Sequence, residues 1–324
     1  MKKGIGVGIE DFREVIREDC YYFDKTNYIE ELIKDKTKIK LFTRPRRFGK
    51  TLNMSTLKYF FDVKNAEENR KLFKDLYIEK SEYFKEQGQY PVIFITLKDL
   101  KKNTWKEMNF EIKELLRNLY DEFNFIRDTL SISDLREFDK IWLKEEDANY
   151  DSSLLNLTKY LYNYYKKEVV LLIDEYDSPL ITANQRGYYK DSINFFRNFL
   201  SLALKTNSYL KMGVLTGIVQ VAKEGIFSGL NNVITYNILR NDFKTFFGLS
   251  EEEVEKALKY FELEYKIEEV KRWYDGYKFG NSEVYNPWSI INYLRTKELQ
   301  AYWVNTSDNA LIYDNLKKFN SRCI

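Results

Sequence analysis

Histidine is absent from this 324-residue sequence, and cysteine occurs only as Cys20 and Cys323. The lack of histidine excludes Ser-His-Asp and Cys-His catalysis, and it excludes every histidine-ligated metal site, including the HExxH zinc helix. Two cysteines cannot form a cysteine-rich zinc site, and a single distant pair in a chain of this size is typical of a reduced cytosolic protein. We therefore expect a cytoplasmic location.

Long apolar runs and a strong excess of one charge are also missing. No stretch approaches the ~18 to 20 uncharged apolar residues that a membrane-spanning helix needs, and Glu10 and Asp11 end the N-terminal apolar run too early for a signal peptide. The 52 Lys and Arg residues nearly balance the 50 Asp and Glu residues, which gives a formal charge of +2. We expect no membrane partner, and nucleic acid would bind only through a local basic patch.

Strand and helix patterns alternate through most of the chain. Hydrophobic periodicity predicts helices at residues 27–34, 50–61, 104–124, 152–166 and 189–205, and apolar runs predict strands at 38–42, 92–97, 169–173 and 211–216. The run at 169–173 is apolar on both faces, which is typical of a central strand in a parallel sheet covered by helices on each side. This alternation indicates parallel βαβ units and an α/β fold.

The last part of the chain has a different, mainly helical pattern. Ser250 and Glu253 form a capping-box pattern at the start of a helix, and further helices are expected around Trp273 and at 287–294. We therefore predict an α/β core at residues 1–245 and a helical C-terminal subdomain at residues 246–324.

The most informative segment, residues 42–51, has the sequence Phe-Thr-Arg-Pro-Arg-Arg-Phe-Gly-Lys-Thr. Gly49, Lys50 and Thr51 fit the end of the phosphate-loop pattern G-x-x-x-x-G-K-[ST], whereas Arg44 stands where the first glycine belongs. A predicted strand precedes the segment and a predicted helix follows it, a context that a chance Gly-Lys-Thr turn would lack. In a phosphate loop the backbone N–H groups surround the β-phosphate, the lysine bridges β- and γ-oxygens, and the threonine hydroxyl binds Mg²⁺.

A proline and three arginines distinguish this loop from the usual phosphate-loop pattern. Pro45 fixes its own φ and removes one N–H donor, so the loop is expected to be stiffer than usual. The arginines either hold phosphate oxygens or a partner acid, or they are solvated loop charges. The predicted nucleotide site comprises Arg44, Pro45, Arg46, Arg47, Phe48, Gly49, Lys50, Thr51 and Leu52.

Asp174 and Glu175 directly follow the apolar strand at 169–173. An acid in the first position holds Mg²⁺, and a glutamate beside it can accept a proton from the attacking water. The alternative is a pair of acids at the surface end of a strand. Asp177 is either a second group near the metal or, as we favour, part of a turn closed by an Asx bond. Thr216, at the end of the next strand, is a candidate for contact with the γ-phosphate, although threonine is also an ordinary strand residue.

Taken together, these patterns predict a P-loop NTPase of the additional-strand type, in which strand 211–216 lies between the strands of the loop and the acidic pair. Catalytic roles are expected for Lys50, Glu175 and Thr216, and metal binding for Thr51 and Asp174. The expected ligands are ATP and Mg²⁺, although these residues do not separate ATP from GTP.

The motifs also resemble those of a known family. Residues 44–51 resemble the R-P-R-R-F-G-K-[ST] loop of the bacterial predicted AAA-ATPase-like family, and residues 172–177 resemble its L-I-D-E-Y-D segment. The resemblance extends nearly end to end, through motifs at residues 22–26, 197–200, 215–217, 226–232, 273–277 and 285–289.

This resemblance implies a P-loop ATPase in which the missing first glycine is a family trait. It implies that Asp24, Lys25 and Thr26 lie near the nucleotide base, whereas the residues alone suggest only a polar stretch before a helix. It also implies a C-terminal restriction-endonuclease-like domain in many members, which would begin where this sequence ends. Gln220 departs from the family pattern, because a basic residue is expected near this position.

Three functions stay open at this point. The first is an ATPase whose hydrolysis drives a conformational change, and the second is a slow or non-hydrolysing nucleotide switch that gates a nuclease or nucleic-acid module. The third is a P-loop kinase, which Glu175 disfavours because an acid there suits water as the acceptor. A homo-oligomer would allow a neighbouring subunit to supply a catalytic arginine, worth ~10³- to 10⁵-fold in rate, with Arg186 and Arg197 as candidates.

Overall fold

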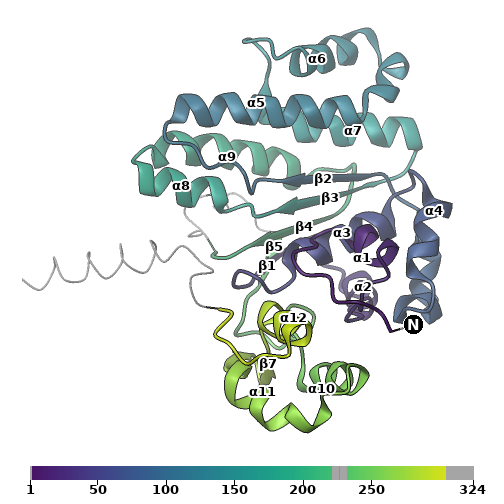
Figure 1. Cartoon of the computed structure of the whole chain (residues 1–324). Coiled ribbons are helices and arrows are strands. Elements are labelled where there is room, and N and C mark those ends of the chain that lie inside the picture. The colour runs from purple at the N-terminus through teal and green to yellow at the C-terminus, as the bar shows by residue number, and fades with distance from the viewer. Residues whose placement is uncertain (1, 221–225, 227–231, 304–324) are drawn as a thin grey trace, which may run out of the picture.

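A computed structural model describes residues 2–220, 226 and 232–303 of the chain (Figure 1). The α-helices are α1 (Phe12–Arg17), α2 (Asn27–Lys34), α3 (Lys50–Phe61), α4 (Ala66–Arg70), α5 (Trp105–Glu122), α6 (Ile132–Trp142), α7 (Ser153–Tyr165), α8 (Ser178–Arg186), α9 (Tyr189–Leu204), α10 (Glu251–Tyr260), α11 (Ile267–Tyr274) and α12 (Pro287–Thr296). The 3₁₀ helices are η1 (Lys71–Phe73), η2 (Tyr77–Lys80), η3 (Glu82–Glu86), η4 (Asn124–Thr129), η5 (Tyr150–Ser152) and η6 (Glu264–Lys266). Among the described helices, none combines the length and the apolar character that crossing a membrane requires.

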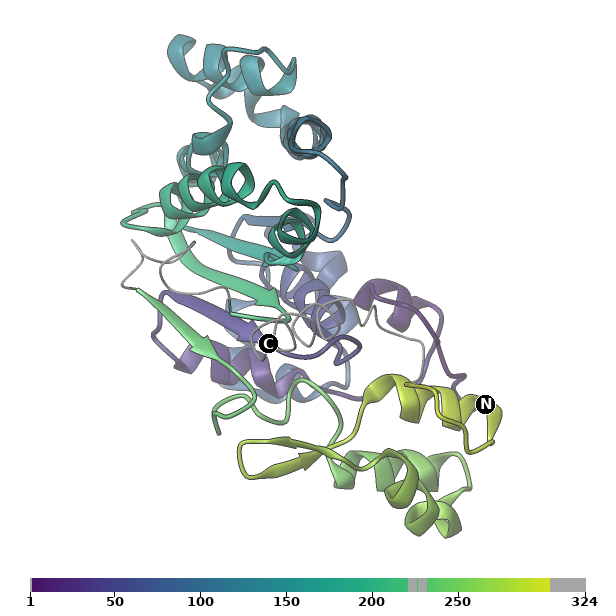
Figure 2. The same cartoon turned by 90° about the vertical axis from the view of Figure 1, so that its left-hand side faces the viewer.

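A parallel sheet forms the centre of the molecule. Its strands are β1 (Ile39–Thr43), β2 (Val92–Thr96), β3 (Val169–Asp174), β4 (Leu210–Gly217) and β5 (Val233–Tyr236), in the order β2-β3-β4-β1-β5. β4 pairs with both β1 and β3, which confirms the predicted additional-strand arrangement of a P-loop NTPase-like fold. The carboxyl ends of the strands lie at one edge, to the left in Figure 1, and Figure 2 looks onto that edge.

Helices cover both faces of this sheet because its strands are apolar on both sides. β3 is buried along its whole length, with Leu171 and Ile173 in one apolar cluster and Val170 and Leu172 in the other. The first cluster includes side chains of α5, α7 and α9, and the second includes side chains of α2 and α3. Each fully buried leucine or isoleucine contributes roughly 1.5–3 kcal/mol relative to exposure, so the sheet is held by two hydrophobic layers.

The C-terminal part packs around an apolar cluster of its own, formed mainly by α10, α11 and α12. The predicted capping box is present, since Ser250 accepts a hydrogen bond from the Glu253 N–H and the Glu253 side chain accepts one from the Ser250 N–H. This part also holds a short antiparallel hairpin, β6 (Tyr277–Phe279) with β7 (Ser282–Val284), which the sequence patterns do not predict. We call residues 246–303 the lid; the boundary at residue 245 stays a prediction.

Gly248 lies where the lid meets the loop that follows β1. Its φ is +109°, and an added Cβ would clash with Val284 and approach the Phe48 ring to 3.0 Å. We expect Gly248→Ala to lower the free energy of unfolding by about 2–4 kcal/mol, because steric clash adds to backbone strain. The matched control is Gly187→Ala: this residue also has positive φ (+84°) but nothing lies within 4 Å of its Cβ position. Gly187→Ala should lower the free energy of unfolding by only about 1 kcal/mol.

Urea unfolding of the two variants beside the parent measures both changes. If Gly248→Ala costs no more than Gly187→Ala, the packing between the lid and this loop is looser than the structure indicates.

Candidate functional site

The loop after β1 turns sharply into α3. Arg47 and Gly49 adopt left-handed backbone conformations, with φ of +69° and +73°, and α3 begins at Lys50. The start of a helix presents unpaired N–H groups and the positive end of the helix dipole, which together favour a phosphate group. The strand, turn and helix thus follow one another as expected, and phosphate binding by residues 44–51 stays a prediction.

Lys50 is held inside this turn. Its side chain is only 5% exposed, and its Nζ donates hydrogen bonds to the Pro45 carbonyl (2.9 Å) and the Arg44 carbonyl (3.2 Å). Burial lowers the pKa of the Lys50 ammonium, while the nearby Glu175 and Asp174 carboxylates act in the opposite direction. The lysine thus faces the acidic end of β3.

The Asp174 carboxylate connects three elements of the core. Its Oδ2 accepts a hydrogen bond from the Thr51 hydroxyl (2.8 Å), and its Oδ1 accepts one from the Thr216 hydroxyl. Asp174 is fully buried at the end of β3, Thr51 lies in the first turn of α3, and Thr216 lies near the end of β4. The structure therefore brings together three residues that the sequence assigns to one site, and their individual roles stay predictions.

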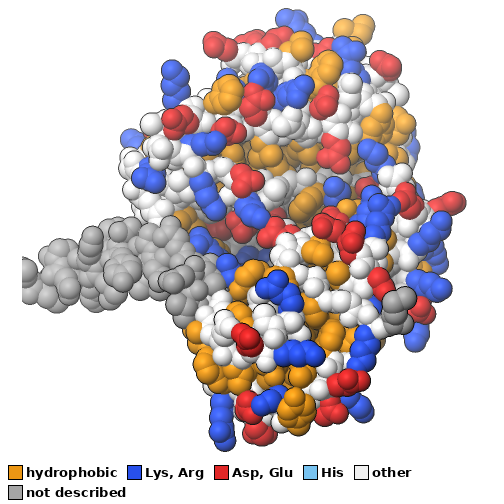
Figure 3. Space-filling model, viewed as in Figure 1, with side chains coloured by type: hydrophobic (Ala, Val, Ile, Leu, Met, Phe, Trp, Pro, Cys, Tyr) orange, Lys and Arg blue, Asp and Glu red, His pale blue; other side chains and the backbone are white. Residues whose placement is uncertain are grey.

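Glu175 extends from the same strand end into a small cavity. Its backbone is left-handed (φ +52°), and its N–H donates to the Thr216 hydroxyl at 3.3 Å. The cavity has a volume of about 130 Å³ and is lined by Arg46, Lys101, Glu175, Asp177, Ser178, Ile181, Thr182, Gln185 and Ile218. Burial raises the pKa of Glu175, the charge of Asp174 raises it further, and Lys50 and Lys101 oppose the shift. Acidic and basic side chains gather around a hollow between the α/β body and the lid (Figure 3).

Asp177 has a structural role that the sequence patterns miss. Its carboxylate accepts hydrogen bonds from the backbone N–H groups of Ile218 and Val219, both at 2.8 Å, and forms no cap bond with its own turn. It therefore fixes the chain that leaves β4 just after Thr216. Gly217 allows this close approach, because an added Cβ would lie 2.8 Å from the Asp177 carboxylate.

The three arginines of the loop have different surroundings. The Arg44 guanidinium is fully buried and donates to the carbonyls of Tyr236 (2.5 Å) and Phe243 (3.2 Å), and burial lowers its pKa to about 10. The Arg47 guanidinium lies 4.1 Å from the centre of the Trp288 ring in the lid. Only the Arg46 side chain lines the cavity beside Glu175. Phosphate contact by the arginine side chains stays a prediction, and in this conformation the geometry favours Arg46.

Phe48 links the loop to the lid hairpin. Its buried ring packs against Phe279 and Tyr277, with centroids 5.2 and 4.9 Å apart, and against Val284. Because Phe48 immediately precedes Gly49, a movement of the phosphate loop must be transmitted to this hairpin or break the contact.

Of Asp24, Lys25 and Thr26, Lys25 contacts the lid, whereas Asp24 and Thr26 bond to the chain at Tyr77 and Ile78 of the core. The Asp24 carboxylate accepts from the Thr26 N–H (2.9 Å) and the Tyr77 N–H (2.7 Å), so it organises the local chain. The Lys25 ammonium is buried and pairs with Glu253 of the lid at 2.5 Å. Lys25 also borders an apolar cavity of about 80 Å³, whose walls include Tyr21, Tyr22, Phe23, Phe48, Gly49, Leu52, Asn53, Phe246, Gly248, Leu249, Pro287 and Ile291.

The oxygen atoms at the end of β3 suit a magnesium ion that also contacts phosphate. Within the described ranges, no group of three or more His, Cys, Asp and Glu side chains forms a metal site by itself. Mg²⁺ needs only one or two carboxylates when phosphate oxygens and waters complete its shell. The Thr51 hydroxyl and the Asp174 carboxylate, 2.8 Å apart, fit that requirement.

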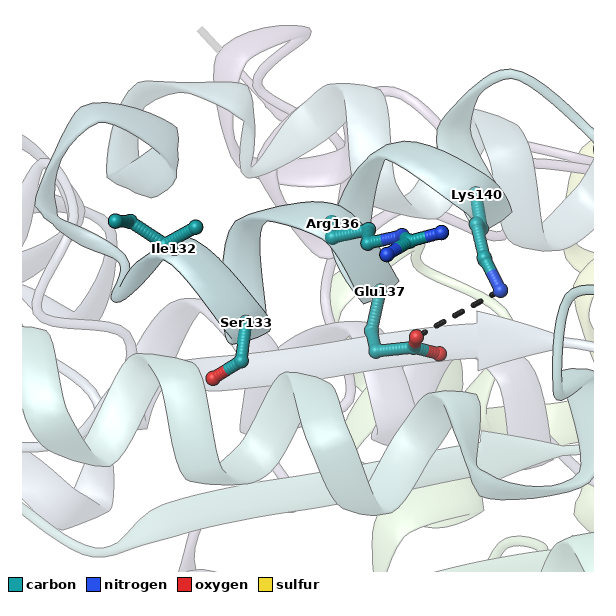
Figure 4. A pocket seen from close by; sticks show the side chains of 5 residues that line it. All are labelled: Ile132, Ser133, Arg136, Glu137 and Lys140. Atoms are coloured by element: carbon teal, nitrogen blue, oxygen red, sulfur yellow. Dashed lines mark ion pairs between the residues drawn. The ribbon is translucent and has the colours of Figure 1, made fainter.

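The larger hollow on α6 does not share these features. It measures about 820 Å³, and Figure 4 shows its lining side chains Ile132, Ser133, Arg136, Glu137 and Lys140, all from one helix. Glu137 pairs with Lys140 at 3.8 Å. Figure 1 places α6 at the opposite end of the molecule from the lid, so no strand end contributes to this hollow.

Other positions singled out in the sequence lie around the site or outside the described residues. Arg186 is exposed in the last turn of α8, Arg197 is half-buried in α9, and Gln220 is exposed beyond the end of β4. Cys323 and most of the motif at residues 226–232 lie outside the described residues.

Comparison with known proteins agrees with this geometry. The model of the family described as predicted AAA-ATPase matches residues 6–227. The chain is 25% identical over 317 residues to a protein of Azotobacter chroococcum mcd 1, described as an uncharacterized protein in the vnfD 5′ region; the match covers 97% of this chain but 56% of that relative. No solved structure matches the chain. Because the family match covers residues 6–227, more than half of the sequence, the chain belongs to the predicted AAA-ATPase family.

Proposed function

We propose that this chain binds MgATP and hydrolyses it, and that nucleotide binding or hydrolysis moves the lid relative to the α/β core. The observation that carries the proposal is the convergence of Lys50, Thr51, Asp174, Glu175 and Thr216 at the carboxyl edge of the sheet. A cation, two hydroxyls and two carboxylates in this arrangement are the groups that phosphoryl transfer to water requires.

Each side chain would have a defined task. Lys50 would exchange the Pro45 and Arg44 carbonyls for β- and γ-phosphate oxygens, which are stronger acceptors because they are charged. Thr51 and Asp174 would hold Mg²⁺, which neutralises phosphate charge and orients the phosphate oxygens. Glu175 would orient a water molecule and take its proton, while the Thr216 hydroxyl lies between the Asp174 carboxylate and the Glu175 N–H, near the expected γ-phosphate.

The apolar cavity beside Leu52 supports a location for the nucleotide base. It adjoins the first turn of α3, and its aromatic walls suit a flat, uncharged ring. Its volume of about 80 Å³ is well below the ~300 Å³ at which ligand pockets begin, so a base would enter only if a wall moved. Gly248, Leu249, Pro287 and Ile291 of the lid form part of that wall. Base binding would therefore displace the lid, which gives the proposed conformational change a physical cause.

A second candidate function is a slow switch that gates a partner module. The chain spans only 56% of the length of its Azotobacter relative, so nearly half of that protein lies outside the match. In such a switch the nucleotide-dependent lid position would control a nuclease or nucleic-acid module, with little turnover. A homo-oligomer in which a neighbouring subunit supplies an arginine would instead raise turnover with protein concentration.

Thermal unfolding with and without MgATP tests nucleotide binding. We expect MgATP at about 100 times its Kd to raise the free energy of unfolding by ~2.7 kcal/mol, because the ligand binds only the folded state. For a chain of this size that corresponds to a rise in Tm of roughly 5 °C or more. MgGTP in place of MgATP measures the base preference, and the absence of any shift at millimolar MgATP would exclude the proposal.

Phosphate release from MgATP, followed over a range of protein concentrations, separates the two candidate functions. A steady rate supports an ATPase, a rate per subunit that rises with concentration supports an oligomer, and binding without release supports the switch.

A further inference from the structure

A second cleft lies at the edge of the sheet opposite to the phosphate loop. Its volume is about 450 Å³. Its lining comes from α2 and the segment after it, the amino end of β1, the end of α3, η3, Tyr90, Glu168 just before β3, and the amino end of β4. The charged residues in its walls are five lysines and three acids: Lys36, Lys38, Lys40, Lys85, Lys211, Asp35, Glu86 and Glu168. The excess of lysine makes this cleft electropositive although the chain as a whole is nearly neutral.

Two of the three acids are already engaged by uncharged donors. The Asp35 carboxylate accepts hydrogen bonds from the Thr37 N–H (2.7 Å) and from the Tyr236 hydroxyl. The Glu86 carboxylate accepts one from the Tyr90 hydroxyl at 2.5 Å. These bonds stabilise the carboxylates in place, and neither carboxylate lies within hydrogen-bonding distance of a cleft lysine.

Glu168 is the acid that faces the lysines. It lies between Lys38, just before β1, and Lys211 of β4, at 3.6 and 3.9 Å. The two ammonium groups share one carboxylate at distances too long for good hydrogen bonds. These side chains are each about 40% exposed and solvent can reach them. The two ammonium groups carry one positive charge more than the Glu168 carboxylate neutralises, and the cleft has room for a second anion.

Lys40 adds a buried charge to the same cleft. Its side chain is 1% exposed, and its Nζ donates to the carbonyls of Asp35 (2.9 Å) and Thr37 (2.5 Å), while the nearest Asp35 carboxylate oxygen is 4.0 Å away. Burying an ammonium without a close carboxylate is unfavourable. Accordingly, burial lowers the pKa of Lys40 to about 8; the charge of Asp35 opposes this shift, and the charge of Lys36 adds to it. An anion in the cleft would offset this cost.

We propose that this cleft binds a phosphate-bearing ligand, whose phosphate oxygens accept hydrogen bonds from Lys38 and Lys211 in the field of Lys40. The phosphate is the recognised group, and it can belong to the backbone of a single-stranded nucleic acid or to a free phosphorylated small molecule. The partly exposed rings of Tyr83 and Tyr90 at the cleft wall would contact the organic part of either ligand. This site is separate from the phosphate loop and does not depend on the proposed ATPase function.

The test uses the full chain and two probes. A fluorescein-labelled oligonucleotide of twelve thymidines is titrated by fluorescence anisotropy at low salt, and inorganic pyrophosphate is titrated by calorimetry. Both titrations are repeated with Lys50→Ala. A probe that binds at the phosphate loop should no longer bind this variant, whereas a probe that binds in the cleft should bind it as it binds the parent. Circular dichroism and thermal unfolding check that every variant is folded.

Removing positive charge from the cleft should weaken binding of the probe, and removing negative charge should strengthen it. The double variant Lys38→Gln/Lys211→Gln is expected to weaken binding of the responsive probe at least tenfold, whereas Glu168→Gln should strengthen it several-fold because it frees both lysines. Lys256→Gln is the matched control, since this exposed lysine lies on the lid and pairs with Glu252. It should leave both affinities unchanged.

The two probes identify the source of the phosphate, and the variants test whether it binds in the cleft. Cleft-dependent binding of the oligonucleotide identifies nucleic acid as the source of the phosphate, and cleft-dependent binding of pyrophosphate alone identifies a free phosphorylated ligand. The inference is overturned if neither probe binds, or if the lysine and Glu168 variants bind as the parent does.

Discussion

Lys50→Ala is expected to abolish the stabilisation by MgATP and to lower phosphate release by on the order of 10²- to 10³-fold, the usual loss when one preorganised donor is removed from a charged transition state. The ammonium lies at the start of α3 and faces the carboxylates of Glu175 and Asp174. Alanine keeps the helix but removes the ammonium that, in the proposed function, would contact the phosphates. Thermal unfolding and phosphate release, measured on the same preparations, check the two parts of this prediction.

The matched control for this variant is Lys58→Ala. Lys58 belongs to the same helix, is partly exposed, forms a loose ion pair with Glu122 at 3.9 Å, and lies 5.6 Å from the centre of the Phe94 ring. Its removal should leave the MgATP-dependent rise in Tm intact. A Lys50→Ala protein that is stabilised by MgATP as strongly as the Lys58→Ala protein would show that the nucleotide does not bind at this loop.

The central strands were predictable from sequence because burial imposes a continuous apolar run on them. β3 is buried on both faces, and the residues predicted as strand, 169–173, fall within it. The edge strand β5 was missed: only Tyr236 of its four residues is buried, so its composition carries little signal. The strands of the lid hairpin have three residues each, too few to show any periodicity.

The positions of the candidate site residues were predictable where the backbone alone places a residue. Lys50 and Thr51 follow a strand-to-helix turn and Asp174 ends a strand, so their positions follow from the order of parallel strands. The directions of long side chains were not predictable, because contacts distant in sequence decide them. Arg44 turns toward carbonyls of Tyr236 and Phe243, and Lys25 toward Glu253 of the lid. No local pattern around residues 25 or 44 encodes these partners.

Glu175→Gln is expected to keep MgATP binding and to lower phosphate release by ~10²- to 10⁴-fold, the range that general base catalysis contributes. Glutamine has the same shape but cannot accept the proton of the attacking water. Glu168→Gln is the matched control, because Glu168 immediately precedes β3 and Glu175 immediately follows it. The control should release phosphate at the parental rate. Equal rates for Glu175→Gln and the parent would show that another group takes the proton.

The pH dependence of phosphate release gives an independent readout of the same carboxylate. Burial, and then the charge of Asp174, raise the pKa of Glu175, and Lys50 and Lys101 only partly oppose the shift. A proton acceptor must be ionised, so kcat/KM, which reports the free enzyme, is full above the raised pKa. It falls as the pH drops through that pKa, at a higher pH than for an ordinary glutamate. In Glu175→Gln this acidic limb should disappear, and the residual rate should change little with pH over the same range. If the parent and Glu175→Gln share the same acidic limb, the titrating group is not Glu175, and the general base must be sought among the other groups that line its cavity, Asp177 first.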